Sequence, residues 1–230
     1  MSFTPLSYQL KRQIEEFGDH RVEIECLKDL NATIDELFGL LEKTGDTSLL
    51  EDLCPYFGVV WPSARALSHT LIKEAGLRGG SLAGLTILEL GCGLAIPSLL
   101  AARLGAEITA TDFHPEVPKF LEKNKVINSC PQIKYINADW RQNAEALGTF
   151  DWVIGSDILY EVQHTKQVAK VVAQTVKPTG MAIIADPARP YLQAFSDEME
   201  ALGFKGQTEV LEAFDTPLPK EIFVIRLQRH

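Results

Sequence analysis

The sequence predicts an α/β fold in which parallel strands alternate with helices, and three consecutive stretches support this prediction. Residues 86–90 form an apolar, β-rich run that is followed by two glycines, Gly91 and Gly93, spaced one residue apart. Residues 95–105 show a helical pattern that ends in glycine, and residues 106–112 form a second short strand that ends in an acid. Together these stretches match the first half of a nucleotide-binding βαβ unit.

The composition predicts a folded protein with one main domain. The chain has 230 residues, and 46% of them are hydrophobic, which is enough for a sizeable core. We expect residues 1–55 to form an N-terminal extension or lid and residues 56–230 to form the main domain. No apolar run approaches the roughly 18 residues of a membrane span, and the first residues lack the apolar stretch of a secretory signal. With widely spaced cysteines, these features predict a soluble cytoplasmic protein.

The net charge of −9 is concentrated near the N-terminus, where residues 1–55 hold 12 acidic and 5 basic side chains. Nucleic-acid binding needs clustered Lys and Arg, so no nucleic-acid partner is expected. The acidic excess either attracts a basic substrate or forms a solvated helical face, and both interpretations stay open. The scattered histidines lack the spacing of metal ligands, so no metal is expected.

Two glycines and two acids define the predicted ligand. Gly91 and Gly93 permit positive φ and let the backbone approach a ligand closely. Asp112, 23 residues after Glu89, ends a strand where a carboxylate can accept hydrogen bonds from both ribose hydroxyls. Ile96 stands where a dinucleotide-binding turn has its third glycine, and the charge of Glu89 repels phosphate but suits a cation. S-adenosylmethionine, a nucleoside with a positive tail and no phosphate, fits this pattern.

The run from Glu89 to Gly93, followed by Asp112, resembles motif I and the next acid of the seven-strand (class I) S-adenosylmethionine-dependent methyltransferases. The resemblance covers residues 60–228 and implies a Rossmann-like, seven-stranded mixed sheet with an antiparallel last strand and helices on both faces. It also implies that S-adenosylmethionine is the cofactor and that Glu89, Gly91, Gly93 and Asp112 bind it. The alternative is an ordinary Rossmann-like turn with another ligand or none.

The N-terminal extension is predicted to be helical with one strand. Apolar spacing predicts a helix over residues 2–19, and strict alternation predicts a strand over residues 21–27. A further helix through residues 34–41 is expected to end near Gly45, with Asn31 or Thr33 as its cap. In the main domain the patterns predict helices near 63–76, 113–127, 168–177 and 195–202, strands near 132–137, 150–155, 181–185, 208–212 and 221–227, and a turn at 216–219.

Three aromatic or acidic positions are predicted to surround the adenine. Phe113 follows the ribose acid, where class members often place a residue against the adenine. Asp139 and Trp140 follow the next strand and resemble the adenine-reading motif of the class, in which the acid accepts the adenine amino proton. The alternative is that Asp139 caps a helix.

Further residues resemble a subgroup that methylates protein lysines. In that subgroup a Pro-Tyr-x-x-x-x-Trp-Pro segment, here ending at Trp61 and Pro62, places its tryptophan against the cofactor. A buried structural Trp61 is an equal alternative. Trp140 after Asp139 also matches the subgroup.

The end of the strand at 150–155 is predicted to flank the transferable methyl group, which makes Ser156 a cofactor-binding candidate. Asp157-Ile-Leu-Tyr160 matches the Asp/Glu-x-x-Tyr/Phe motif of the subgroup. The match implies that Asp157 orients the incoming amine and that Tyr160 forms an aromatic wall. The alternative is that Asp157 caps the following helix. Because a carboxylate alone raises the pKa of a nearby amine, Asp157 must serve geometry more than deprotonation.

Asp186-Pro-x-Arg189 resembles the electron-transfer-flavoprotein lysine methyltransferases and their bacterial relatives. Asp186 and Arg189 either pair with each other or touch substrate. The leading interpretation is therefore methylation of a protein lysine by direct displacement. A small-molecule N- or O-methyltransferase and a noncatalytic interaction module are the alternatives, because the fold does not fix the substrate. Neither a membrane partner nor an oligomeric state is predicted.

Overall fold

The computed structural model describes residues 7–45, 47–142, 144–212 and 221–230. The strands are β1 (Leu10–Phe17), β2 (His20–Leu27), β3 (Thr86–Leu90), β4 (Glu107–Asp112), β5 (Lys134–Asn137), β6 (Phe150–Ser156), β7 (Val176–Asp186), β8 (Phe204–Glu212) and β9 (Glu221–Arg229). The helices are α1 (Leu30–Thr44), α2 (Leu50–Leu53), α3 (Pro62–Leu77), α4 (Ile96–Arg103), α5 (Val117–Ile127), α6 (His164–Thr175) and α7 (Leu192–Ala201), with short 3-10 turns at Thr47–Leu49, Tyr56–Gly58 and Ala144–Leu147.

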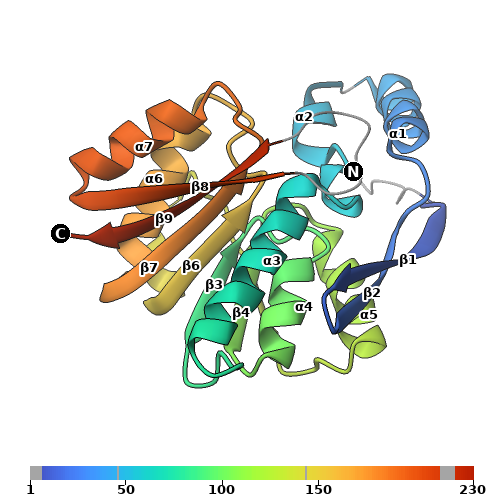
Figure 1. Ribbon diagram of the computed structural model, residues 1–230. Coiled ribbons are helices and arrows are strands. Elements are labelled where there is room, and N and C mark those ends of the chain that lie inside the picture. Colours follow the sequence, from blue (N-terminus) through green and yellow to red (C-terminus); the bar gives the residue numbers. More distant parts are fainter. Residues whose placement is uncertain (1–6, 46, 143, 213–220) are drawn as a thin grey trace.

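The main sheet has seven strands in the order β5-β4-β3-β6-β7-β9-β8 (Figure 1). The strands from β5 to β7 run parallel, whereas β9 is antiparallel to both of its neighbours, β7 and β8. The predicted seven-stranded mixed sheet with an antiparallel last strand is therefore confirmed. The predicted turn at 216–219 lies outside the described residues.

Helices cover both faces of the sheet, because side chains on each central strand alternate between two cores. Ile87 on β3 packs in the core under α3, α4 and α5. Leu88 and Leu90 point to the opposite face and pack in the core under α6 and α7. With both faces covered, the carboxyl ends of the parallel strands form the edge where ligands of such sheets bind.

The helix predicted over residues 2–19 is wrong where the structure describes these residues, because β1 forms a hairpin with β2. The pairing runs from Leu10 opposite Leu27 to Phe17 opposite His20. Period-two burial explains the strand: Ile14 is 45% exposed, whereas Glu15 and Phe17 are 5% and 1% exposed. Gly18, interpreted from the sequence as a helix stop, instead has φ +59° in the hairpin turn. The extension is therefore not wholly helical.

The hairpin is attached to the main domain through α5. The Glu25 N–H donates to Asn124 Oδ1 at 2.7 Å, and the Glu23 N–H donates to Asn128 Oδ1 at 3.1 Å. These side chains satisfy the exposed edge of β2. Phe17 lies in the same core as residues of α3 and α4. The domain boundary at residue 55 stays a prediction.

Other element boundaries differ from the predictions by a few residues. The α1 helix is capped by Asp29, whose Oδ1 accepts the Ala32 N–H at 3.0 Å, rather than by Asn31 or Thr33. Its predicted end at Gly45, with φ +74°, is confirmed. The β7 and β8 strands begin earlier than predicted, at Val176 and Phe204.

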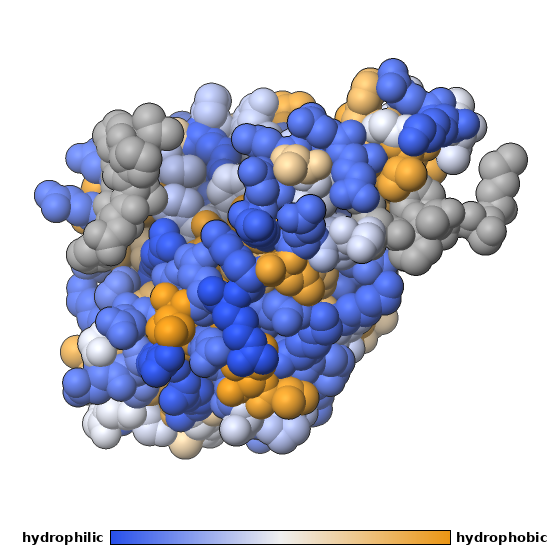
Figure 2. Space-filling model, turned by 90° about the vertical axis from the view of Figure 1, so that its right-hand side faces the viewer, coloured by the Kyte–Doolittle hydropathy of each residue, from blue (hydrophilic) through white to orange (hydrophobic). Residues whose placement is uncertain are grey.

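The face of the molecule that carries the hairpin is largely hydrophilic, with apolar side chains in small separate groups (Figure 2). This agrees with the acidic excess of residues 1–55. Within the described ranges no helix combines the length and the apolar character that a membrane crossing requires.

Candidate active site

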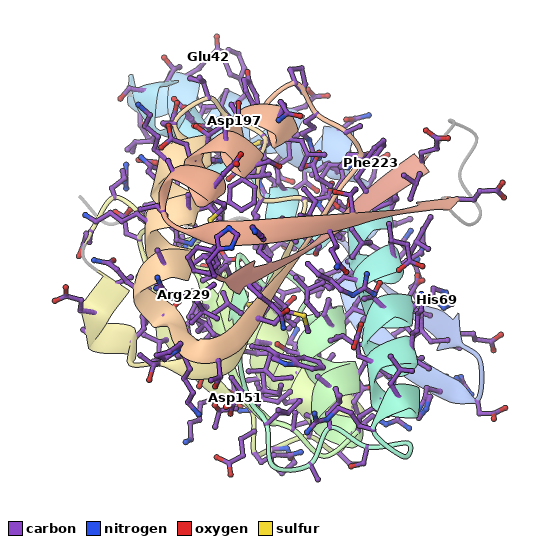
Figure 3. All side chains as sticks on the ribbon, turned by 60° about the vertical axis from the view of Figure 1, so that its left-hand side comes forward. Glu42, His69, Asp151, Asp197, Phe223 and Arg229 are labelled. Atoms are coloured by element: carbon purple, nitrogen blue, oxygen red, sulfur yellow. The ribbon has the colours of Figure 1, made fainter. Side chains whose placement is uncertain are left out.

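The register of the sheet brings the predicted site residues to one edge. Leu90 pairs with Gly155 and with Thr111, so the residues that follow β3, β4 and β6 begin at the same level. Ser156 pairs with Ala185 on β7, and Phe223 of β9 lies opposite Asp186. Figure 3 labels Phe223 at this edge and labels Asp151, near the start of β6, at the other end of the sheet.

The turn after β3 requires both of its glycines. Gly91 and Gly93 have φ values of +61° and +48°. A Cβ at Gly91 would lie 2.8 Å from Cγ2 of Ile158, and one at Gly93 would lie 3.0 Å from the carbonyl oxygen of Phe57. The turn therefore needs glycine for both its conformation and its close packing.

The Asp112 carboxylate is held at the end of β4 by two backbone groups. Its Oδ2 accepts the N–H of Gly93 and its Oδ1 accepts the N–H of His114, both at 2.9 Å. Burial raises the pKa of Asp112, and these hydrogen bonds oppose that rise. Since a carboxylate has about four acceptor sites, both oxygens can still accept a ribose hydroxyl. The geometry fits the predicted role, which stays a prediction.

Glu89 is buried, and its carboxylate is bonded to the start of α4. The residue is 1% exposed, and Oε2 accepts both the N–H and the hydroxyl of Ser98 in the first turn of α4. Burial raises the pKa of Glu89 to about 8, which opposes a negative charge at this position. The predicted contact of Glu89 with the cofactor stays a prediction, and its contact with Ser98 ties the end of β3 to the start of α4.

Phe113 and Asp139, both predicted to contact adenine, are bridged by Arg141. Arg141 Nε lies 2.8 Å from Oδ1 and 3.0 Å from Oδ2 of Asp139. Its guanidinium carbon lies 4.8 Å from the centre of the Phe113 ring, and Nη1 lies 3.8 Å from Oδ1 of Asp52 in α2. The alternative of Asp139 as a cap is not observed, since Asp139 accepts the N–H of Arg141 outside any α-helix.

Trp140, His164 and Tyr160 form an aromatic cluster behind the turn. The His164 ring lies 5.2 Å from Trp140 and 4.5 Å from Tyr160, and both contacts are edge-to-face. The Trp140 ring also lies 3.2 Å from the position of a Cβ on Gly91. Its Nε1 is a buried donor without an acceptor among the described residues. Tyr160 is 48% exposed and can form one wall of an acceptor site.

Trp61 is half-buried and precedes α3. Its Nε1 donates to the carbonyl oxygen of Tyr56 at 2.9 Å, and the two rings are 6.3 Å apart. Both predicted roles, contact with cofactor and structural packing, stay open.

Asp157 caps a helix, but not the one predicted. It is 9% exposed and has φ +59°, and its Oδ2 accepts the N–H of Ser63 at the start of α3 at 3.2 Å. The residue before α6 is Gln163, so the alternative that Asp157 caps the following helix is wrong. Ser156, half-buried, ends β6 beside it.

Arg189 joins Asp157 to Asp186. Its Nη2 lies 2.8 Å from Oδ1 of Asp157, and its Nη1 lies 2.8 Å from Oδ2 of Asp186. Its backbone N–H also donates to Asp186 Oδ1 at 2.7 Å. The ion pair weighed from the sequence is present. The contact with Asp157 was missed, because spacing along the chain does not indicate which β-strand ends are neighbours.

The structure thus brings together the glycine turn, Asp112 and the segment of Asp157. Asp112 is joined to the turn through the N–H of Gly93, and Ile158 packs against Gly91. Sequence reasoning missed Ser63, Ser98, Arg141 and His164. Arg141 follows Asp139 by two residues and His164 follows Tyr160 by four, so proximity along the chain was the available signal.

Comparison with known proteins places the chain in a family. A family model described as "Lysine methyltransferase" matches residues 51–199. The chain belongs to this lysine methyltransferase family. The family consists of S-adenosylmethionine-dependent methyltransferases, and two features of this chain fit the cofactor. Gly91 and Gly93 give the turn a positive-φ backbone without side chains, and Asp112, which accepts the N–H of Gly93, keeps free acceptor sites for ribose hydroxyls.

Individual curated proteins are similar to this chain over part of their length. Histone-arginine methyltransferase METTL23 of Rattus norvegicus is 29% identical over 49% of this chain and 51% of its own. Protein N-lysine methyltransferase METTL21A of Mus musculus is 36% identical over 44% of this chain and 47% of its own. The chain spans about half the length of the curated relatives it matches.

Solved structures show the same fold at low sequence identity. Precorrin-6y C5,15-methyltransferase from Geobacter metallireducens has a TM-score of 0.58 and 14% identity, covering 72% of this chain and 87% of its own. The glycopeptide N-methyltransferase MtfA complexed with sinefungin has a TM-score of 0.58 and 13% identity, covering 71% and 94%. The predicted class I fold is thereby confirmed.

Proposed function

We propose that the protein transfers a methyl group from S-adenosylmethionine to the side-chain amine of a protein lysine. The observation that carries this proposal is the placement of Asp157. Its carboxylate lies at the carboxyl end of β6, next to the glycine turn, and is fixed by Ser63 and Arg189. The partly exposed ring of Tyr160 lies on the same segment. A fixed acceptor group beside an aromatic wall suits an aliphatic amine.

The protein's contribution is alignment and desolvation. Bound S-adenosylmethionine supplies an electrophilic methyl group on a sulfonium. The lysine ammonium first loses a proton to solvent. The nitrogen lone pair then forms the N–C bond, the C–S bond breaks with its electron pair going to sulfur, and the positive charge moves to nitrogen. In this proposal Asp157 accepts an N–H of the amine and directs its lone pair, while Asp112 and the glycine turn fix the ribose.

The test is incubation of the protein with methyl-labelled S-adenosylmethionine and fractionated cell extract. Label is expected in protein, and acid hydrolysis is expected to release methyl-lysine. Asp157→Ala, which removes the acceptor for the amine, is expected to lower transfer by about 100-fold or more while cofactor affinity stays within a few-fold. Asp112→Ala is expected to abolish cofactor binding. Equal loss of binding and transfer in Asp157→Ala would make Asp157 a structural or cofactor residue instead.

The same experiment separates the other candidates. Methyl-arginine in the hydrolysate would favour a protein arginine as the acceptor, as in the histone-arginine methyltransferase METTL23. Label in small molecules alone would favour a small-molecule methyltransferase. The Xanthomonas oryzae ubiquinone biosynthesis O-methyltransferase, 32% identical over 45% of this chain and 44% of its own, motivates that second candidate. Cofactor binding without any transfer would leave a noncatalytic module.

Two finer proposals rest on the sequence. Asp186-Pro-x-Arg189 motivates electron-transfer flavoprotein as the first purified acceptor to try. A cytoplasmic location is tested by fractionation of cells that express the tagged chain.

A further inference from the structure

The site contains an electrostatic conflict that its own residues can resolve. A lysine amine must be neutral to act as a nucleophile, and its unperturbed pKa is about 10.4. An opposite charge within about 4–6 Å favours the charged form and moves a pKa by about 1 to 3. An isolated Asp157 carboxylate would therefore hold the acceptor as an unreactive ammonium ion.

Asp157 is not isolated, because Arg189 is bound between two carboxylates. The guanidinium lies 2.8 Å from Asp157 Oδ1 and 2.8 Å from Asp186 Oδ2, so one cation is shared by two anions. The Asp186 side chain is completely buried, and that of Asp157 is 7% exposed. Solvent screening between these groups is correspondingly weak.

The conformations on both sides of this contact are unusual. Asp157 and Ala188, the residue before Arg189, both have φ +59°, which residues with a Cβ rarely adopt. Such residues persist where the surrounding structure holds them, and they cluster at functional sites. The ion pair is thus carried by two tight backbone segments that meet at the end of the sheet.

Few other charged or titratable groups face Asp157 among the described residues. The α3 helix contributes the N–H of Ser63 at its positive end. The segment after β7 contributes Arg189 and, through it, Asp186. Arg189 is therefore the cation that determines the field at Asp157.

We propose that Arg189 is a positioning residue that offsets the charge of Asp157, so that an amine held by Asp157 can lose its proton and accept the methyl group. Asp186 limits this effect by sharing the cation. The inference rests on the proposed function. It assigns the Asp157–Arg189–Asp186 cluster a role in the reaction, beyond fixing the loop.

Two substitutions change the charge of the cluster in opposite directions. Arg189→Gln removes the cation, and Asp186→Asn removes the competing anion while keeping the shape of the side chain. The rate of label transfer from methyl-labelled S-adenosylmethionine to the extract fraction labelled by the wild type is measured from pH 6 to 10. In Arg189→Gln we expect the rate at pH 7 to fall about tenfold or more and to approach the wild-type rate toward pH 10, because the amine pKa rises. In Asp186→Asn the profile is expected to move to lower pH.

A merely structural role gives a different result. If the cluster only fixes the loop, both variants lose rate by the same factor at every pH, and this outcome would overturn the proposal. Arg189→Lys is the matched control, since it keeps the charge and loses the fork geometry. Its profile is expected to lie near that of the wild type, with a lower maximum. Should Arg189→Gln fail to fold, the two remaining variants still test the proposal. The pH profile of Asp186→Asn is expected to move to lower pH, and that of Arg189→Lys is expected to stay near the wild type.

A second readout needs no methyl acceptor. The Asp157 carboxyl carbon is followed by NMR in the full chain labelled at aspartate, and its signal is assigned with Asp157→Asn. Loss of Arg189 is expected to raise the pKa of Asp157, and Asp186→Asn is expected to lower it. If these shifts occur and no acceptor is methylated, the proposed function fails and the charge coupling stands. If methylation occurs and neither pKa nor rate profile moves, the inference fails and the proposed function stands.

Discussion

The guanidinium of Arg141 lies over the ring of Phe113, with 4.8 Å between the guanidinium carbon and the ring centre. The same side chain holds both carboxylate oxygens of Asp139. A planar cation therefore lies on the two groups that are predicted to contact the adenine. Arg141 would therefore compete with an adenine for one face of the Phe113 ring and for the oxygens of Asp139.

We expect Arg141→Ala to bind the cofactor more tightly, by a few-fold, because it removes this competition. Titration calorimetry with S-adenosylhomocysteine measures the affinity. Lys134→Ala, which removes an exposed charge on the neighbouring strand β5, is the control and is expected to change affinity little. Weaker binding in Arg141→Ala would mean that the guanidinium contacts the cofactor.

Gly91→Ala is expected to lower stability by about 2–4 kcal/mol, since it adds a left-handed alanine and overlaps with Ile158 and Trp140. Urea unfolding measures this loss, and cofactor affinity is expected to fall with it. Gly84 also has a positive φ, but a Cβ there meets nothing within 4 Å. Gly84→Ala is therefore the matched control, with strain of about 1–2 kcal/mol and unchanged affinity.

Glu89→Gln is expected to become more stable relative to the wild type as the pH rises. The pKa of Glu89 is raised from 4.5 to about 8, so the folded state binds the proton more tightly than the unfolded state. This stability is fully present below pH 4.5 and is lost as the pH rises through about 8. The glutamine keeps an acceptor for Ser98 and does not ionise. The difference in unfolding free energy should grow between these pH values, by at most about 5 kcal/mol, and then level off. A difference independent of pH would contradict the raised pKa.

Asn124→Ala is expected to lower the stability of the whole protein by about 1–3 kcal/mol, because it leaves the partly buried N–H of Glu25 without its acceptor. Chemical denaturation followed by both fluorescence and circular dichroism tests whether the hairpin unfolds with the main domain. Asn31→Ala, exposed on α1, is the control and is expected to stay within about 0.5 kcal/mol of the wild type. Separate transitions would support an independent unit within residues 1–55.

The main sheet was predictable because its strands are short apolar runs that end in glycine or acid, as at Leu90 and Asp112. The hairpin was not, because the spacing of Leu6, Leu10, Ile14 and Phe17 also fits a helix. The choice was made by tertiary contacts. The buried Glu15 is paired with Arg65 on α3, whose Nε lies 2.6 Å from Oε2, and that partner is 50 residues distant in sequence.

The candidate site was predictable where one local motif defines it, as in the glycine turn. It was not predictable where the deciding partner comes from another strand end. The contact of Arg189 with Asp157 and the hydrogen bond from Ser98 to Glu89 both depend on which elements are neighbours in space. The raised pKa of Glu89 was missed for the same reason, because it follows from burial, which the residue type does not indicate.

The hydrogen bond from the Ser63 N–H to Asp157 gives one carboxylate two duties, one in the architecture and one in the proposed chemistry. A replacement that cannot accept the Ser63 N–H would also remove this hydrogen bond at the beginning of α3. Divergence toward new substrates in this scaffold should therefore proceed through the surrounding walls, such as Tyr160, while the acid itself remains.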